Sequence, residues 1–233
     1  MNSPTTGAPS PKRGGGRRPA GAGGQDMKRM ARGGGLNLIG AVLGQAALFG
    51  VVSLLGNILG EASVGRYSVL YAMLTMLSLL SLAGFRAGLT RFVAMFLADN
   101  DSARVRGTIR LGLGVNIAAS AVIGGVLALG APWVASVYNN PDLAPGIRWM
   151  ALALPAASFS DAALSATQGW RSQREFALIG RIFDPLAQLV LTGAFLLLGW
   201  GVNGAIIAIP IAAWATAALA ALALAKRLRT LPK

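Results

Sequence analysis

Long apolar runs dominate the sequence after residue 35 and restrict the fold more than any other feature. Each is close to the ~20 residues that a helix needs to cross a bilayer. Inside a bilayer every backbone N–H and C=O must be paired within the protein, which leaves only helices and closed barrels, and the runs lack the alternation of barrel strands. The sequence therefore predicts an all-α integral membrane protein with six transmembrane helices, near 36–59, 67–90, 109–137, 147–169, 176–199 and 203–225.

The side-chain inventory argues against catalysis. The chain is 54% hydrophobic and 12% charged, with no cysteine or histidine, which excludes disulfides, thiolate chemistry, imidazole bases and histidine metal sites. Its 8 carboxylates fall mostly in the connections. We expect no enzyme activity, no catalytic residue, no cofactor and no metal site.

The net charge of +13 raises the question of a nucleic-acid partner. Many of the basic residues lie in residues 1–35, a Gly/Pro-rich segment without apolar periodicity, typical of a disordered tail. We expect this tail to contact anionic lipid headgroups and expect no nucleic-acid partner. The predicted domains are the tail (1–35), the transmembrane bundle (36–226) and a short basic tail (227–233).

The basic residues also predict the orientation. With the N-terminus in the cytoplasm, all but two of the 21 Lys and Arg residues fall on the cytoplasmic side, the exceptions being Arg66 and Arg148. This bias predicts a multi-pass protein of the cell (inner) membrane with both termini cytoplasmic. Five aromatic residues would then form a belt at the outer interface: Tyr67, Trp133, Tyr138, Trp149 and Trp200.

Two arginines interrupt the end of the second run, in "LAGFRAGLTRFVAMFLADND" (82–101). A charge near the centre of a bilayer costs roughly 3 kcal/mol or more. Arg91 is close enough to the cytoplasmic end to extend its side chain to the headgroups. Arg86 lies one to two helical turns deeper, so the same explanation fits it less well.

Polar residues spaced three or four apart form stripes on three predicted helices. Such stripes should face the bundle interior or a water-filled cavity rather than lipid. The hydroxyl and amide groups could instead serve only as contacts between helices, whereas the charged ones favour a transport pathway. The stripes are Tyr71, Thr75, Ser78 and Arg86; Ser158, Asp161, Ser165 and Gln168; and Arg181, Asp184, Gln188 and Thr192.

The segment "LGNILGEASVGRYSVLYAMLTMLSLLSLAGFRAGLTRFVA" (55–94) and the later "TQGWRSQREF" (167–176) resemble polysaccharide-biosynthesis membrane proteins. These are flippases of the multidrug/oligosaccharidyl-lipid/polysaccharide exporter superfamily. The resemblance implies two helical lobes around a basic cavity that binds the diphosphate and sugar of a polyprenyl-linked precursor. This chain has six spans where the family has twelve or more, so it corresponds to one lobe, the N-terminal half. Arg86 matches the region where relatives carry cavity-facing cations.

Three functions remain open. The first is one lobe of a lipid-linked oligosaccharide flippase, as a fragment or as a half that pairs with a second half or with another copy. The second is a cation-coupled multidrug exporter, in which Asp161 and Asp184 bind protons or sodium. The third is an assembly subunit that transports nothing. The candidate substrate-binding residues are Arg86, Arg91, Asp161, Gln168, Arg181, Asp184 and Gln188.

Overall fold

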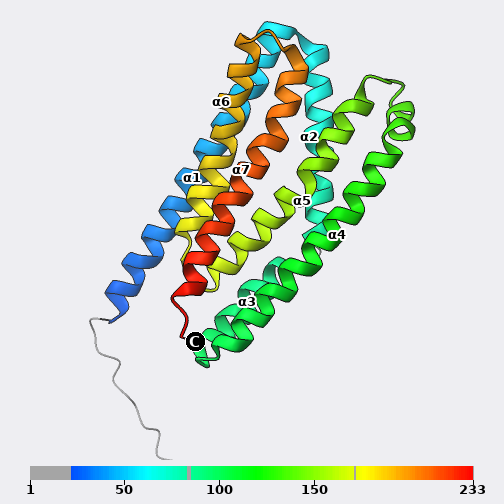
Figure 1. The fold of residues 1–233 in the computed structure, drawn as a ribbon. Coiled ribbons are helices and arrows are strands. Elements are labelled where there is room, and N and C mark those ends of the chain that lie inside the picture. Colours follow the sequence, from blue (N-terminus) through cyan, green and yellow to red (C-terminus); the bar gives the residue numbers. More distant parts are fainter. Residues whose placement is uncertain (1–21, 83–84, 171, 233) are drawn as a thin grey trace, which may run out of the picture.

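The computed structural model describes residues 22–82, 85–170 and 172–232. These residues form helices joined by short turns, and no strand occurs among them (Figure 1). The first 21 residues of the expected tail, together with Arg171 and Lys233, lie outside the described part. The elements are α1 (Ala22–Leu59), α2 (Glu61–Leu82), α3 (Phe85–Ala98), α4 (Ser102–Val137), α5 (Leu143–Gln168), the π-helix η1 (Phe176–Phe183), α6 (Asp184–Leu197) and α7 (Gly201–Arg229).

Helices α1 and α7 reach past the residues 36–226 predicted for the bundle. Helix α1 begins at Ala22, so residues 22–35, which the sequence assigned to the tail, are helical. Adding a turn to an existing helix costs far less than nucleating one, which allows α1 to continue through a glycine-rich stretch. Helix α7 continues to Arg229, because basic residues in a last turn interact favourably with the helix dipole.

The second predicted span (67–90) falls on α2 and α3, and residues 83–84 between them lie outside the described part. Helix α2 already begins at Glu61, because Gly60 alone makes the turn from α1 with a φ of +81°, a conformation that glycine adopts at no steric cost. Helix α2 ends at Leu82, and α3 continues from Phe85 to Ala98. Asp101 then caps α4 by accepting a 2.9 Å hydrogen bond from the backbone N–H of Arg104.

Within the described residues, five helical segments are long and apolar enough to cross a membrane: Asn37–Leu59, Glu61–Ser81, Ser102–Val137, Phe176–Leu197 and Gly201–Arg229. Helix α5, the fourth predicted span, is not among them. It packs against α2, α3, α4 and α7, and much of its surface, including Leu154 and Leu164, is buried. A helix that its neighbours shield from lipid does not need the large apolar side chains of lipid-facing helices.

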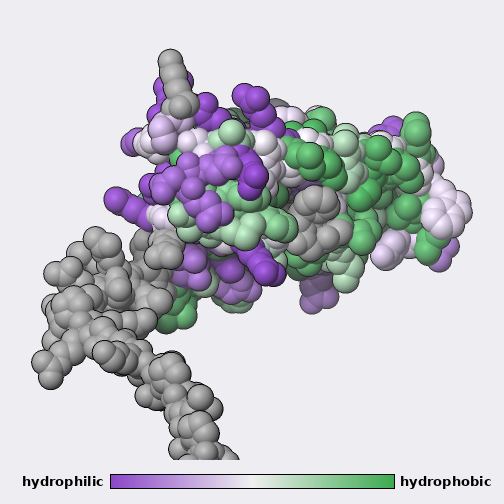
Figure 2. Space-filling model, turned by 90° about the horizontal axis from the view of Figure 1, so that it is seen from below, coloured by the Kyte–Doolittle hydropathy of each residue, from purple (hydrophilic) through white to green (hydrophobic). Residues whose placement is uncertain are grey.

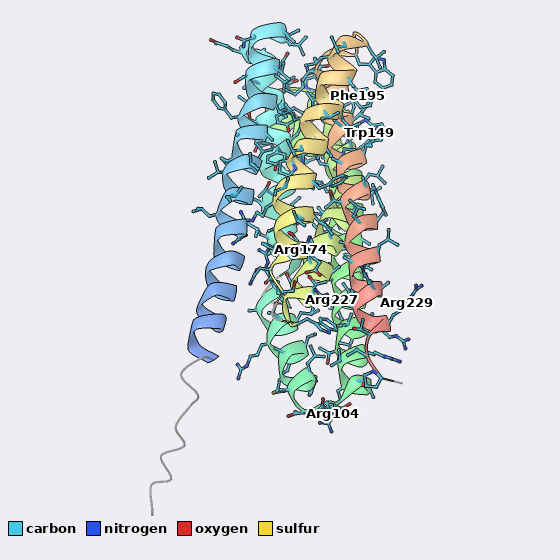
Figure 3. All side chains as sticks on the ribbon, turned by 90° about the vertical axis from the view of Figure 1, so that its left-hand side faces the viewer. Arg104, Trp149, Arg174, Phe195, Arg227 and Arg229 are labelled. Atoms are coloured by element: carbon cyan, nitrogen blue, oxygen red, sulfur yellow. The ribbon has the colours of Figure 1, made fainter. Side chains whose placement is uncertain are left out.

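Several arginines lie toward one end of the bundle, and two aromatic residues lie toward the other. The described chain begins and ends at the same end, here called the basic end (Figure 1). Figure 3 places Arg104, Arg174, Arg227 and Arg229 toward this end, with Trp149 and Phe195 toward the other. Figure 2, which views the basic end, shows its hydrophilic residues beside hydrophobic flanks.

The predicted aromatic belt is wrong for one residue. Trp133, Tyr138, Trp149 and Trp200 are exposed, as the belt requires. Tyr67 instead is buried and stacks on Tyr71 with ring centres 5.9 Å apart. Tyr67 therefore belongs to the core between α2 and its neighbours.

An ion pair holds the connection between α5 and η1 to the end of α7. The Nε of Arg227 donates a 3.0 Å hydrogen bond to Glu175, and the Ser172 hydroxyl donates one of 2.6 Å to the other carboxylate oxygen. Partial burial raises the pKa of Glu175. Hydrogen bonds from Ser172, a backbone amide and Arg227 outweigh that effect and leave the pKa below its ordinary value.

Candidate functional site

A cavity of about 190 Å³, open to the surface, lies among the helices where all three predicted polar stripes contribute side chains. Helix α2 supplies Tyr71, Thr75 and Ser78, as its spacing predicted. Side chains from α5, α6 and α7 face them, and η1 contributes a glycine. The lining is Tyr71, Leu74, Thr75, Ser78, Leu79, Ala157, Ser160, Asp161, Leu164, Gly180, Asp184, Gln188, Ile209, Ala213 and Thr216.

Asp184 connects α6 to α7 at one wall of the cavity. Its Oδ1 accepts a 2.8 Å hydrogen bond from the hydroxyl of Thr216, and its Oδ2 accepts one of 3.0 Å from Nε2 of Gln188. The spacing in sequence allowed an ion pair between Asp184 and Arg181. Among the residues described here, the two side chains form none within 4 Å.

Asp161 and Arg86 lie close together at the edge of the cavity. The Nη2 atom of Arg86 is 3.9 Å from Oδ1 of Asp161, and this distance is too long for a hydrogen bond. Nε of Arg86 donates a 3.3 Å hydrogen bond to the Ser165 hydroxyl, which itself donates to the backbone carbonyl of Asp161. Arg86 is therefore oriented through Nε, while 44% of its side chain remains exposed.

Two guanidinium groups lie over the ring of Phe176. The guanidinium carbon of Arg86 is 5.2 Å from the ring centre, and that of Arg181 is 5.6 Å from it. Phe176 is the first residue of η1, and π-helical turns occur frequently at functional sites. The contact between η1 and α1 is close, since a Cβ at Gly44 would overlap the carbonyl oxygen of Arg181.

Two predicted site residues lie away from the cavity. Arg91 is exposed on α3, and Gln168 is the half-buried last residue of α5. Neither lines the cavity. Arg86 and Arg181 also lie outside its lining but are brought together at Phe176.

Sequence reasoning missed two polar residues of the lining, Thr216 and Ser160. Thr216 left a signal, because it is the only hydroxyl-bearing residue in the apolar stretch 204–225. Ser160 left none, since it is one residue out of phase with the stripe that contains Asp161.

The sequence profile of the family described as "Polysaccharide biosynthesis protein" matches residues 30–233. The chain belongs to this family. No curated protein matches it at a significant level.

Solved structures show which fold this family member adopts. A MATE protein in the bent conformation superimposes with a TM-score of 0.76 at 17% identity, over 92% of this chain and 48% of that one. An outward-facing multidrug resistance MATE family transporter of the MOP superfamily gives 0.77 at 21%, with the same shares. The chain is thus a multi-pass membrane protein with the fold of such a transporter, and it spans about half the length of the structures it matches.

Proposed function

We propose that the chain is one lobe of a transporter that moves polyprenyl-diphosphate-linked sugars across the cell membrane. Six helices would cross the membrane: the five apolar segments and, in addition, the buried helix α5, which is fourth in chain order. Both termini would lie in the cytoplasm. The observation that carries the proposal is the pair of guanidinium groups of Arg86 and Arg181 on one aromatic ring beside a polar cavity. Membership of the polysaccharide biosynthesis family supports it.

The chemistry of the two arginines suits a diphosphate. A guanidinium presents a planar fork of donors that matches phosphate oxygens and cannot lose its charge. Ser165 orients Arg86 by accepting a hydrogen bond from Nε. The two terminal nitrogens of Arg86 take no part in this bond and remain for a phosphate. Asp161 at 3.9 Å offsets the cost of the cation without a hydrogen bond that a phosphate would have to break.

The size of the cavity supports a second lobe as partner. Its volume of about 190 Å³ is below the roughly 300–1,000 Å³ of sites that enclose a ligand, and a lipid-linked sugar is large. A separate second half or another copy of the chain would complete the cavity by facing it. The substrate would then bind between two lobes.

A second candidate, cation-coupled export of small molecules, is favoured by Asp184. Its carboxylate is held by a hydroxyl and an amide, and Arg181 does not pair with it. Such a carboxylate can bind a proton or a sodium ion. If the protein were this kind of exporter, Asp184→Asn would abolish dye efflux driven by a proton or sodium gradient.

The proposed function is tested by complementation of a flippase-deficient strain, with the second half supplied and membrane levels checked. Arg86→Ala should abolish transport and Arg86→Lys should impair it, because a point charge cannot replace a bidentate fork. Arg91→Lys is the matched control on the same helix and should leave transport unchanged. Equal tolerance at both positions would contradict a phosphate-binding role for Arg86.

A further inference from the structure

A second hollow lies between α3 and α4 and shares no residue with the polar cavity. Its volume is about 300 Å³, and its lining is mostly apolar: Gly88, Leu89, Phe92, Gly107, Thr108, Leu111 and Gly112. Gly88 and Gly107 create the space, whereas a Cβ at Gly112 would overlap the side chain of Leu89. A Cβ at Gly107 would have nothing within 4 Å, and one at Gly88 would meet only the ring edge of Phe92 at 4.0 Å.

Two stacked phenylalanine rings connect this hollow, here called the α3–α4 groove, to the guanidinium group of Arg104. Phe92 in the groove stacks on Phe96 with ring centres 6.3 Å apart. The guanidinium carbon of Arg104 lies 5.8 Å from the centre of the Phe96 ring. Arg104 precedes Gly107 by three residues, so both lie on one face of α4.

Arg104 is placed to meet an anion from solvent. Its side chain is 68% exposed, and its ion pair with Asp101 engages Nε at 3.2 Å. The two helices are basic overall, since the exposed Arg91 of α3 and Arg110 of α4, together with Arg104, outnumber the carboxylates of Asp99 and Asp101. An apolar slot with a cation at its end matches an amphiphile with a negative head.

We propose that the α3–α4 groove binds one acyl chain of an anionic phospholipid of the cytoplasmic leaflet, with its phosphate at Arg104. The seven helical steps from Arg104 to Leu111 span about 10 Å at 1.5 Å per residue. This length fits within one leaflet, half of a hydrocarbon core of about 30 Å. The negative surface potential of that leaflet favours the same orientation.

The position of the groove favours a lipid over the second lobe. The polar cavity is lined by α2, α5, η1, α6 and α7, whereas the groove belongs to α3 and α4 alone. A lobe that faces the cavity therefore has no need to cover the groove. Phe92 and Leu111, at its walls, are 47% and 67% exposed, as expected of a surface that contacts lipid.

Lipid retention measured by native mass spectrometry tests the proposal. The purified protein is mixed with phosphatidylglycerol or phosphatidylcholine of identical acyl chains. Wild type should retain phosphatidylglycerol with roughly fivefold preference, the effect of one basic residue at an anionic surface. Arg104→Gln should remove the preference but keep retention, and Gly107→Leu should lower retention of both lipids by filling the groove.

Gly125→Leu is the matched control, because it lies on the same helix and a Cβ there also has nothing within 4 Å. It should bind lipid as wild type does. If Gly107→Leu does not fold, Gly88→Leu fills the groove from α3. The proposal would be overturned if a folded groove variant, Gly107→Leu or Gly88→Leu, retained as much lipid as wild type does. It would also be overturned if wild type retained the two lipids equally. A dimer of this chain that Gly107→Leu dissociates would overturn it as well.

Discussion

Arg86 of α3 and Phe176 of η1 are in contact, with the guanidinium carbon 5.2 Å from the ring centre. The two residues are far apart in sequence and meet because α3 and η1 both pack against α5. Together with Ser165 and Asp161, the ring surrounds a charge that would otherwise cost roughly 3 kcal/mol or more in lipid. Arg181 lies on the same ring at 5.6 Å, so one aromatic residue positions both candidate phosphate ligands.

Replacing Phe176 should therefore weaken substrate binding at both arginines. Each cation–π contact contributes about 0.5–2 kcal/mol, so the loss of one should lower substrate affinity by roughly two- to thirtyfold, and Phe176→Leu removes both. Phe176→Tyr keeps the aromatic face and should retain most of the affinity. The measurement is substrate concentration dependence of transport, corrected for membrane level. Equal affinities for the two variants would show that the ring only fills space.

Removing the Thr216 hydroxyl should disturb Asp184. The hydroxyl is buried and donates to a carboxylate in the cavity wall, and loss of such a donor costs about 1–3 kcal/mol. Thr216→Val, which keeps the shape, should lower the thermal stability in detergent, whereas Thr216→Ser should not. A Val variant as stable as wild type would mean that water or another donor replaces the hydroxyl at no cost.

The ion pair of Glu175 and Arg227 should make stability depend on pH. A carboxyl group whose pKa is depressed in the folded state stabilises the protein fully at pH values above its ordinary pKa of 4.5. This contribution is lost as the pH falls through the lower pKa of the folded state. A partly exposed pair contributes up to about 1 kcal/mol. Glu175→Gln should therefore lower the melting temperature by a few degrees at pH 7 and have less effect at pH 3.

The control for that experiment is Asp99→Asn, at an exposed position just after α3 that forms no ion pair within the described residues. It should melt as wild type does at both pH values. A Glu175 variant with the same deficit at pH 3 as at pH 7 would remove the electrostatic explanation.

The predicted membrane orientation is testable with reporters in the turns. Fusions near Glu61, Asn140 and Gly201 should read external, and those near Asn100, Gln173 and Lys233 internal, because the basic residues favour the cytoplasmic side. One site on the wrong side would break the six-span topology, including the placement of α5 as a span.

The sequence predicted much of this fold because the physics of a bilayer leaves few choices. Apolar length identified the helices, and spacing of three and four identified the faces that line the cavity, including Tyr71, Asp161 and Asp184. Sequence could not predict which helices become neighbours, such as the packing of α3 against both α4 and α5. It also could not predict that Tyr67 is buried.

Pairing across helices was the other limit. The spacing of Arg181 and Asp184 allowed an ion pair, but the π-helical turns of η1 change which side chains face one another, and Arg181 stacks on Phe176 instead. Phe176 carries no signal that separates it from other apolar residues. Its role depends on two arginines that only the tertiary structure brings to it.

The central claim, that Arg86 and Arg181 bind a diphosphate, is tested most directly by calorimetric titration of the protein in detergent with farnesyl diphosphate and farnesol. The Gly107→Leu variant is titrated as well, so that tail binding in the α3–α4 groove is separated from the cavity. We expect the diphosphate to bind and farnesol to bind far more weakly. Arg86→Ala should lower the affinity for farnesyl diphosphate by roughly tenfold or more, since hydrogen bonds to charged groups contribute about 1.5–3 kcal/mol. Arg91→Ala should leave this affinity unchanged. Farnesol binding as tightly as farnesyl diphosphate, or equal affinities in the two alanine variants, would contradict the claim.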